Sequence, residues 1–243
     1  MANWDQRTRT AQPFAGVQTG APASVYDAGL RSYMLSVYNY MASGVLLTGI
    51  VAMLFASWSG MPAVLMSPLR WVIMLAPLAF VMVLSFGIGR LSTAAAQAVY
   101  WGFAVAMGLS MASIFLVFTA TSIATTFFAT AAAFAGLSLY GYTTKRDLSA
   151  MGTFLIMGVV GLLVASLINV FVQSSGLQLV ISFVGVLLFA GLTAYDTQKI
   201  KSIYYQVQGT EFMGKSVILG ALSLYLDFVN MFTFLLQFMG DRR

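Results

Sequence analysis

The chain has 243 residues, of which 60% are hydrophobic and only 8% are charged, whereas soluble domains carry about 25% charged residues to cover a wet surface. This composition excludes a sizeable soluble domain and favours a membrane protein with several spans. The formal net charge is +5, and the basic residues lie between apolar segments, which indicates a role in membrane topology rather than in nucleic-acid binding. The chain has no cysteine and no histidine, which excludes disulfides, thiolate or imidazole metal sites and serine–histidine hydrolases.

Residues 1–32 are polar, contain proline and glycine, and lack the apolar core of a signal peptide. We interpret them as a flexible cytoplasmic tail that is not cleaved, in which Arg7, Arg9 and Arg31 are solvated topology anchors. Residues 33–243 are predicted to form one transmembrane domain.

Seven apolar segments follow the tail, each close to the roughly 20 residues that a spanning helix requires. They are residues 35–58, 69–89, 96–118, 121–142, 150–171, 179–195 and 216–239. The predicted fold class is therefore an all-α integral membrane protein, a bundle of seven transmembrane helices. The weakest boundary is at Thr119 and Ala120, where neither charge nor proline marks a turn, so six spans with a re-entrant seventh segment stay an alternative.

The basic residues between the segments predict the orientation. With a cytoplasmic N-terminus, nine of them fall on the inner side and three on the outer side, which satisfies the positive-inside rule. The inner residues are Arg7, Arg9, Arg31, Arg90, Lys145, Arg146, Lys199, Lys201 and Lys215, and the outer ones are Arg70, Arg242 and Arg243. We predict a multi-pass protein of the bacterial inner membrane with its N-terminus in the cytoplasm and its C-terminus outside.

The sixth segment ends in GLTAYDTQKIK, which places Asp196 at the cytoplasmic interface, followed by Lys199 and Lys201. A hydrophilic loop over residues 197–215 is expected to lead into the seventh segment. Straight helices leave Asp196 near the interface and Asp227 near the midplane, so tilt or a broken helix would have to bring the two together. The alternative for Asp196 is an interfacial acid that balances the two lysines.

The seventh segment carries one carboxylate, Asp227, about 16 Å from its start and hence near the bilayer midplane. A charge at that depth costs at least about 2.5–3.5 kcal/mol, so we expect Asp227 to face a cavity or partner and to serve an ion or a proton. The alternative is a protonated Asp227 that only joins two helices by a hydrogen bond. Small or polar residues share its helical face: Gly220, Ser223, Asn230 and Gln237.

Three stretches resemble the Bax inhibitor-1 family, also called transmembrane Bax inhibitor motif proteins. They are YGYTTKRDL at 140–148, GLTAYDTQKIK at 191–201 and LSLYLDFVNMF at 222–232, and the resemblance, to the bacterial branch, covers about residue 30 to the C-terminus. It implies a seven-helix fold with the last helix central and a calcium leak gated by an aspartate pair, which by motif is Asp196 and Asp227. It also implies that Arg90, in FGIGRLS, pairs with an aspartate in the closed state; the alternative is a plain topology residue.

These features together predict a non-enzymatic, pH-sensitive cation leak channel or exchanger, with Ca²⁺ as the cation. Two carboxylates in a low-dielectric site tend to share one proton, which a divalent cation would displace. Ca²⁺ would bind Asp196 and Asp227 only transiently, with water, Ser223, Asn230 or backbone carbonyls completing its shell. No other cofactor is expected, and the expected partners are lipid, Ca²⁺ and protons, with no nucleic acid.

Two other functions stay open. A non-transporting regulator would bind a membrane protease or other membrane proteins, with the N-terminal tail as the natural contact. An intramembrane aspartyl protease would need a GxGD motif at its second aspartate, whereas LYLD ends at Asp227 in this chain.

Overall fold

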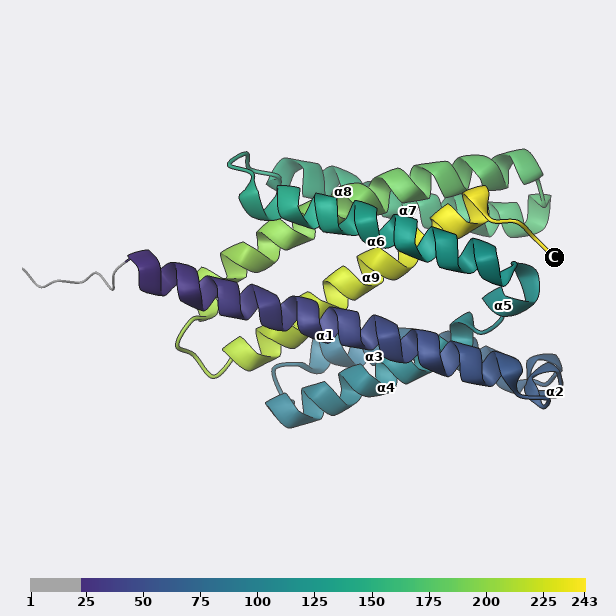
Figure 1. The fold of residues 1–243 in the computed structure, drawn as a ribbon, viewed down its shortest axis with the longest axis horizontal. Coiled ribbons are helices and arrows are strands. Elements are labelled where there is room, and N and C mark those ends of the chain that lie inside the picture. Colours follow the sequence, from purple (N-terminus) through teal and green to yellow (C-terminus); the bar gives the residue numbers. More distant parts are fainter. Residues whose placement is uncertain (1–22) are drawn as a thin grey trace, which may run out of the picture.

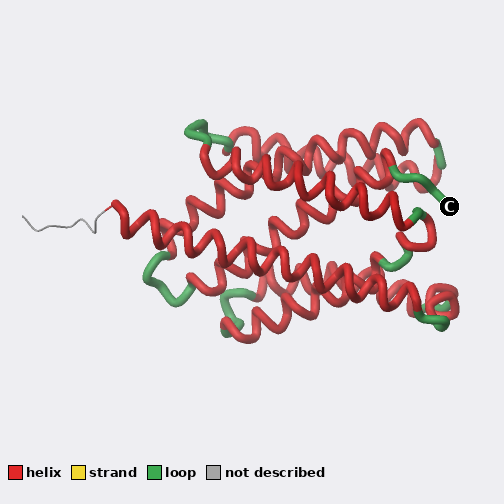
Figure 2. Tube along the Cα trace, viewed as in Figure 1, coloured by secondary structure: helices red, strands yellow, loops and turns green. Residues whose placement is uncertain are grey.

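The computed structural model describes residues 23–243, so the part of the predicted tail that carries Arg7 and Arg9 lies outside the described residues. Seven of its helices are long and apolar enough to cross a membrane, which confirms the predicted all-α fold class. Within the described range the helices are α1 (Ala23–Ser57), α2 (Met61–Met66), α3 (Leu69–Gly87), α4 (Thr93–Met111), α5 (Ile114–Val117), α6 (Ala120–Thr143), α7 (Ser149–Val172), α8 (Ser175–Val207) and α9 (Met213–Met239). Figure 2 shows that most of the connections lie at the two ends of the bundle, as a membrane-spanning arrangement requires.

The helices form two layers with α9 between them (Figure 1). One layer consists of α1, α3 and α4, the other of α6, α7 and α8, and α9 crosses diagonally between the two. In the most apolar stretch of α9, 67% of the residues are buried, against 11–44% in the other spans. The last helix is therefore central, as predicted.

Side-chain caps explain where several helices begin. Ser92 accepts a hydrogen bond from the amide of Ala95 at the start of α4, which satisfies a donor that the helix itself leaves free. Thr119 caps α6 in the same way, by accepting from the amide of Ser122. This cap is the boundary between the third and fourth spans that neither charge nor proline marked. The third span is itself divided, because α4 ends at Met111 and the short α5 continues it.

Two helices extend beyond the predicted spans. Helix α1 begins at Ala23, inside the predicted tail. Helix α8 continues to Val207, so the hydrophilic loop expected over residues 197–215 is wrong and only five residues, 208–212, join α8 to α9.

The extension of α8 is amphipathic, which is why its polar residues suggested a loop. Ile200 and Tyr204 are one turn apart and both buried, while Lys199, Ser202 and Tyr205 are exposed. The Tyr204 ring lies 5.3 Å from that of Tyr33 in α1. One face of the extension is thus packed and the other solvated.

The last residues of the chain are tied to the corner between α5 and α6. The amide of Thr119 donates to the carbonyl of Asp241 at 3.1 Å, and the amide of Arg243 donates to that of Val117 at 3.0 Å. The amide of Asp241 also donates to Oγ of Ser122 at 2.8 Å. These bonds fix the end of α9 against α6.

Gly141 marks a close approach of α6 and α8, and it provides a test of the fold. A Cβ at this position would collide with the carbonyl oxygen of Ala194, whereas a Cβ at Gly161 of α7 would meet nothing within 4 Å. We expect Gly141→Ala to destabilise the protein by about 1–3 kcal/mol and to lower its thermal midpoint in detergent. Gly161→Ala should leave the midpoint unchanged or raise it. Equal midpoints for both variants and the wild type would contradict the close approach of α6 and α8.

Candidate functional site: an aspartate pair between the last two helices

The register of α8 and α9 brings the two aspartates to a similar depth. The helices are antiparallel, and Gly220 of α9 lies against Ile200 of α8. Because the helices are antiparallel, Asp196, four residues before Ile200, is level with Leu224, four residues after Gly220. Asp227 lies three residues after Leu224, which is about 4.5 Å along the axis of α9. The two carboxylates therefore come from facing helices at positions less than one turn apart.

The expectation that Asp196 stands at the end of its helix is wrong. Helix α8 continues for eleven residues past Asp196, to Val207. Asp196 is thus about 16 Å from the end of α8, and Asp227 is about 21 Å from Met213 at the start of α9. Neither tilt nor a broken helix is needed to bring the pair together.

Both aspartates are withdrawn from solvent, Asp227 almost completely. Asp227 is 4% exposed, and its Oδ2 has no hydrogen-bond partner within residues 23–243. Asp196 is half-buried. Lys199 follows Asp196 by three residues, about one turn further along α8, and is exposed. The two aspartates therefore lie on facing helices with a lysine one turn away, on the cytoplasmic side in the predicted orientation.

A second unpaired polar atom belongs to the residue that follows Asp196. Oγ1 of Thr197 is buried and, like Oδ2 of Asp227, has no hydrogen-bond partner in the described part of the chain. Buried polar groups are nearly always paired in folded proteins, so each of these oxygens is a free ligand for a proton, water or cation. Among the described residues no cluster of three or more acidic, histidine or cysteine side chains exists, so a cation here would have two carboxylates at most.

Arg90 does not pair with the aspartates in this conformation. It is exposed in the turn after α3, and no ion pair joins it to Asp196 or Asp227 within the described range. Its present position is that of a basic residue at a helix end. A pairing in another conformation stays a prediction.

The predicted polar face of α9 is present, and a polar residue of α8 is hydrogen-bonded to it. Ser223 and Asn230 are half-buried, and the Asn230 amide donates to the carbonyl of Leu226 at 2.8 Å. Gln237 accepts a hydrogen bond from Nε2 of Gln178 in α8 at 2.7 Å. Sequence reasoning missed Gln178, whose signal is an amide just before the apolar run of the sixth span.

A polar cavity of about 750 Å³ opens at this end of α8 and α9, which is the outer end in the predicted orientation, and we call it the outer cavity. Its lining includes Asn169, Gln178, Gln237 and Arg242. Between this cavity and Asp227, the ring of Phe234 lies over Gly185 and stacks on Phe189 at a centroid distance of 5.8 Å. Aromatic packing therefore separates the aspartate pair from the outer cavity.

The opposite end of the α8–α9 contact packs against α1. The Tyr33 hydroxyl donates to Oγ of Ser216 at 3.2 Å, and the Tyr33 ring packs on Tyr204. Asp227 is thus enclosed by protein, whereas Asp196 stays partly accessible.

The loop between α6 and α7 is fastened to α8 just past Asp196. Gln198 donates to the carbonyl of Arg146 at 2.8 Å and accepts from the amide of Leu148 at 2.9 Å. In this loop, hydrogen bonding from the side chain of Ser149 and, second, from its backbone amide lowers the pKa of Asp147, which is therefore ionised at neutral pH. Two of the three stretches that suggested a family thus lie side by side.

Comparisons with known proteins agree with this arrangement. A family model described as "Inhibitor of apoptosis-promoting Bax1" matches residues 30–243. An uncharacterized protein of Rickettsia prowazekii is 44% identical over 226 residues, which cover 93% of this chain and 96% of that protein. The inner membrane protein YbhL of Escherichia coli is 44% identical over 220 residues, covering 89% of this chain and 94% of YbhL. The chain therefore belongs to the Bax inhibitor family of membrane proteins.

Proposed function

We propose that this chain is a non-enzymatic, pH-sensitive leak channel or exchanger for cations, with Ca²⁺ as the cation, and that the conformation described above is its closed state. The observation that carries the proposal is the buried pair of Asp196 and Asp227 on facing helices, with unpaired oxygens at Asp227 and Thr197. Placing an acid at such depth in a membrane helix costs free energy, which favours a functional role over a structural one.

The chemistry of the pair suits a passing cation. Two neighbouring carboxylates in a site of low dielectric hold either a proton or a divalent cation between them, so proton and Ca²⁺ compete for the same oxygens. Ca²⁺ prefers six to eight oxygen ligands, of which Asp196 and Asp227 supply only part. Binding is then weak, and a weakly bound ion leaves readily, as conduction requires.

A route through the protein would follow the polar face of α9. It would lead from the outer cavity at Gln237 along Thr233 and Asn230 to Asp227. Phe234, packed on Gly185 and Phe189, interrupts this route in the closed state. Opening would therefore require the Phe234 ring to leave Gly185, and hydrophobic constrictions of this kind gate by excluding water.

The cost of burying the aspartate pair can be measured as stability. Asp227→Asn keeps the shape of the side chain but removes the acid that must be buried beside Asp196, so we expect its thermal midpoint in detergent at neutral pH to rise by about 2–4 °C. Glu211→Gln, at an exposed position between α8 and α9, is the matched control and should not change the midpoint. A fall for Asp227→Asn would indicate that the carboxylate makes a stabilising contact in the closed state.

Ca²⁺ influx into proteoliposomes, measured from about pH 5 to about pH 8, tests the proposal directly. Wild type should conduct with a clear pH dependence, because protonation of the pair changes its charge. Asp196→Asn and Asp227→Asn should each flatten that dependence, while Asp147→Asn should preserve it.

The same assay separates a channel from a regulator. A chain without residues 2–22, a deletion that ends just before α1, should keep its flux if it is a channel. Influx no greater than that of empty vesicles at every pH would overturn the proposal and favour a regulator that binds other membrane proteins.

The aromatic barrier provides a third test. Phe234→Ala should raise basal Ca²⁺ influx at neutral pH above that of wild type, because the smaller side chain lets water reach Asp227 from the outer cavity. Phe154→Ala, at a position of α7 that is 72% exposed and lines none of the cavities described, is the matched control and should behave as wild type. Equal influx for both variants and wild type would remove Phe234 as the barrier.

A further inference from the structure

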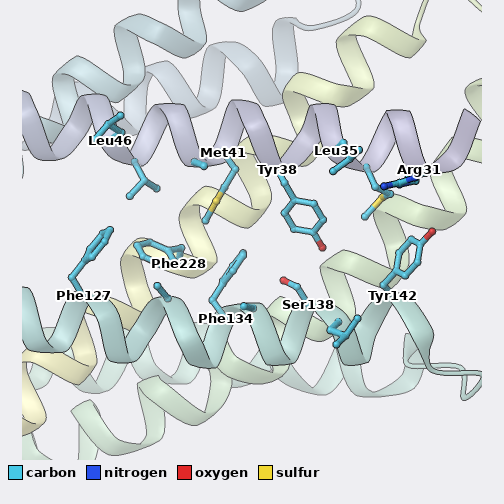
Figure 3. Close-up of a pocket in the computed structure, with 16 residues that line it drawn as sticks. Arg31, Leu35, Tyr38, Met41, Leu46, Phe127, Phe134, Ser138, Tyr142 and Phe228 are labelled. Atoms are coloured by element: carbon cyan, nitrogen blue, oxygen red, sulfur yellow. The ribbon is translucent and has the colours of Figure 1, made fainter. Parts of the chain in front are cut away.

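A cavity of about 710 Å³ lies between α1 and α6, with α9 as its floor (Figure 3). Met41 and Leu46 of α1, Phe127 and Phe134 of α6 and Phe228 of α9 make most of it apolar. Its volume falls in the range of roughly 300–1,000 Å³ that is usual for sites of small molecules. Leu46 at its rim is 65% exposed, so the cavity opens sideways to the hydrocarbon around the bundle.

One end of the cavity is polar. Arg31, Tyr38, Ser138 and Tyr142 line the end nearest the start of α1, which is the predicted cytoplasmic end. Figure 3 shows the hydroxyls of Tyr38 and Ser138 pointing toward each other across the cavity, with Arg31 and Tyr142 beyond them. Along its length the cavity thus presents first apolar side chains, then the two hydroxyl groups and last the guanidinium group of Arg31.

Ser138 gives an independent indication of a ligand. The residue is 5% exposed, and its Oγ has no hydrogen-bond partner in the described part of the chain. A buried hydroxyl directed into an apolar space lacks the partner that nearly all such groups have. A ligand in this cavity would therefore carry a hydrogen-bonding group at the depth of Ser138.

Positive charge at the same end favours an anionic ligand. Arg31 lines the cavity, and Lys201 of α8 lies 4.9 Å from the ring of Tyr142 and donates to its carbonyl at 2.9 Å. Basic pockets between transmembrane helices near the cytoplasmic surface are a known arrangement for anionic head groups. From Arg31 to Leu46, α1 rises about 22 Å, which matches one leaflet of a bilayer roughly 40–45 Å thick.

We propose that this cavity binds one anionic glycerophospholipid of the surrounding membrane. The phosphate lies at Arg31, the glycerol and ester oxygens meet the hydroxyls of Tyr38 and Ser138, and an acyl chain fills the apolar part between α1 and α6. The order of chemistry along the cavity is the order along a phospholipid. The site is separate from the aspartate pair and does not depend on ion transport.

Native mass spectrometry of the full chain in detergent tests the proposal, with dioleoyl phosphatidylglycerol and dioleoyl phosphatidylcholine as probes of equal chain length. Wild type should bind the anionic lipid about fivefold more tightly, the effect of one basic residue at a membrane surface. Arg31→Gln should abolish this preference and Arg31→Lys should retain it. Lys145→Gln, which removes an exposed cation that does not line the cavity, should retain it as well.

The acyl-chain part is tested by filling the cavity. Ala131→Phe adds a ring inside it and should reduce the binding of both lipids, whereas Ala133→Phe, on an exposed face of the same helix and outside the cavity lining, should not. Equal binding of the two lipids by wild type, or wild-type behaviour of Arg31→Gln or Ala131→Phe, would overturn the proposal. So would displacement of the lipid by soluble glycerol phosphate, which would identify a site for free phosphate. Variants are compared with wild type only where their thermal midpoint in lipid-free detergent is unchanged. Arg31→Lys is the control for a change of side chain at position 31 that keeps the positive charge.

Discussion

Hydrocarbon offers no partners for polar groups, so the polar face of α9 can exist only where protein surrounds it. The other helices are arranged around that requirement. Thr48 of α1 donates to the carbonyl of Ala104 in α4 at 2.8 Å, and its hydroxyl lies 2.6 Å from that of Tyr225 in α9. The Tyr225 ring packs edge-on against Phe103 at 4.9 Å. These contacts join α9 to one layer, while α8 and α6 enclose it from the other.

The fold could be predicted from the sequence because spanning helices obey a strong rule of length and apolarity. What could not be predicted were the ends of helices outside the apolar runs. The residues after Asp196 are polar at every exposed position, and only the packing of Ile200 and Tyr204 shows that they continue α8. The hydropathy of the sequence does not reveal such an extension, since its buried residues are few and polar residues lie between them.

The aspartate pair shows how an error in a boundary becomes an error in a site. A loop at residue 197 leaves Asp196 too shallow to meet Asp227, whereas a helix to Val207 places both at similar depth. The residues themselves were recognisable, because an acid within an apolar run stands out. Their environment was not, since the packing of Phe234 on Gly185 and the hydrogen bonds of Gln178 depend on which helices are neighbours.

Helix α9 presents two consecutive residues to two different environments. Asp227 belongs to the contact with α8, and Phe228 forms the floor of the cavity between α1 and α6. A rotation of α9 about its axis would move both residues together. One helix thus contributes to two distinct sites through adjacent residues.

The hydrogen bonds that join Asp241 and Arg243 to the α5–α6 corner use the backbone groups of these two residues. Side chains at positions 241 and 243 can therefore change without loss of these bonds, and only proline, which has no amide hydrogen, would remove a donor. The attachment of α9 to this corner is thus a property of the backbone path rather than of the residue types along it.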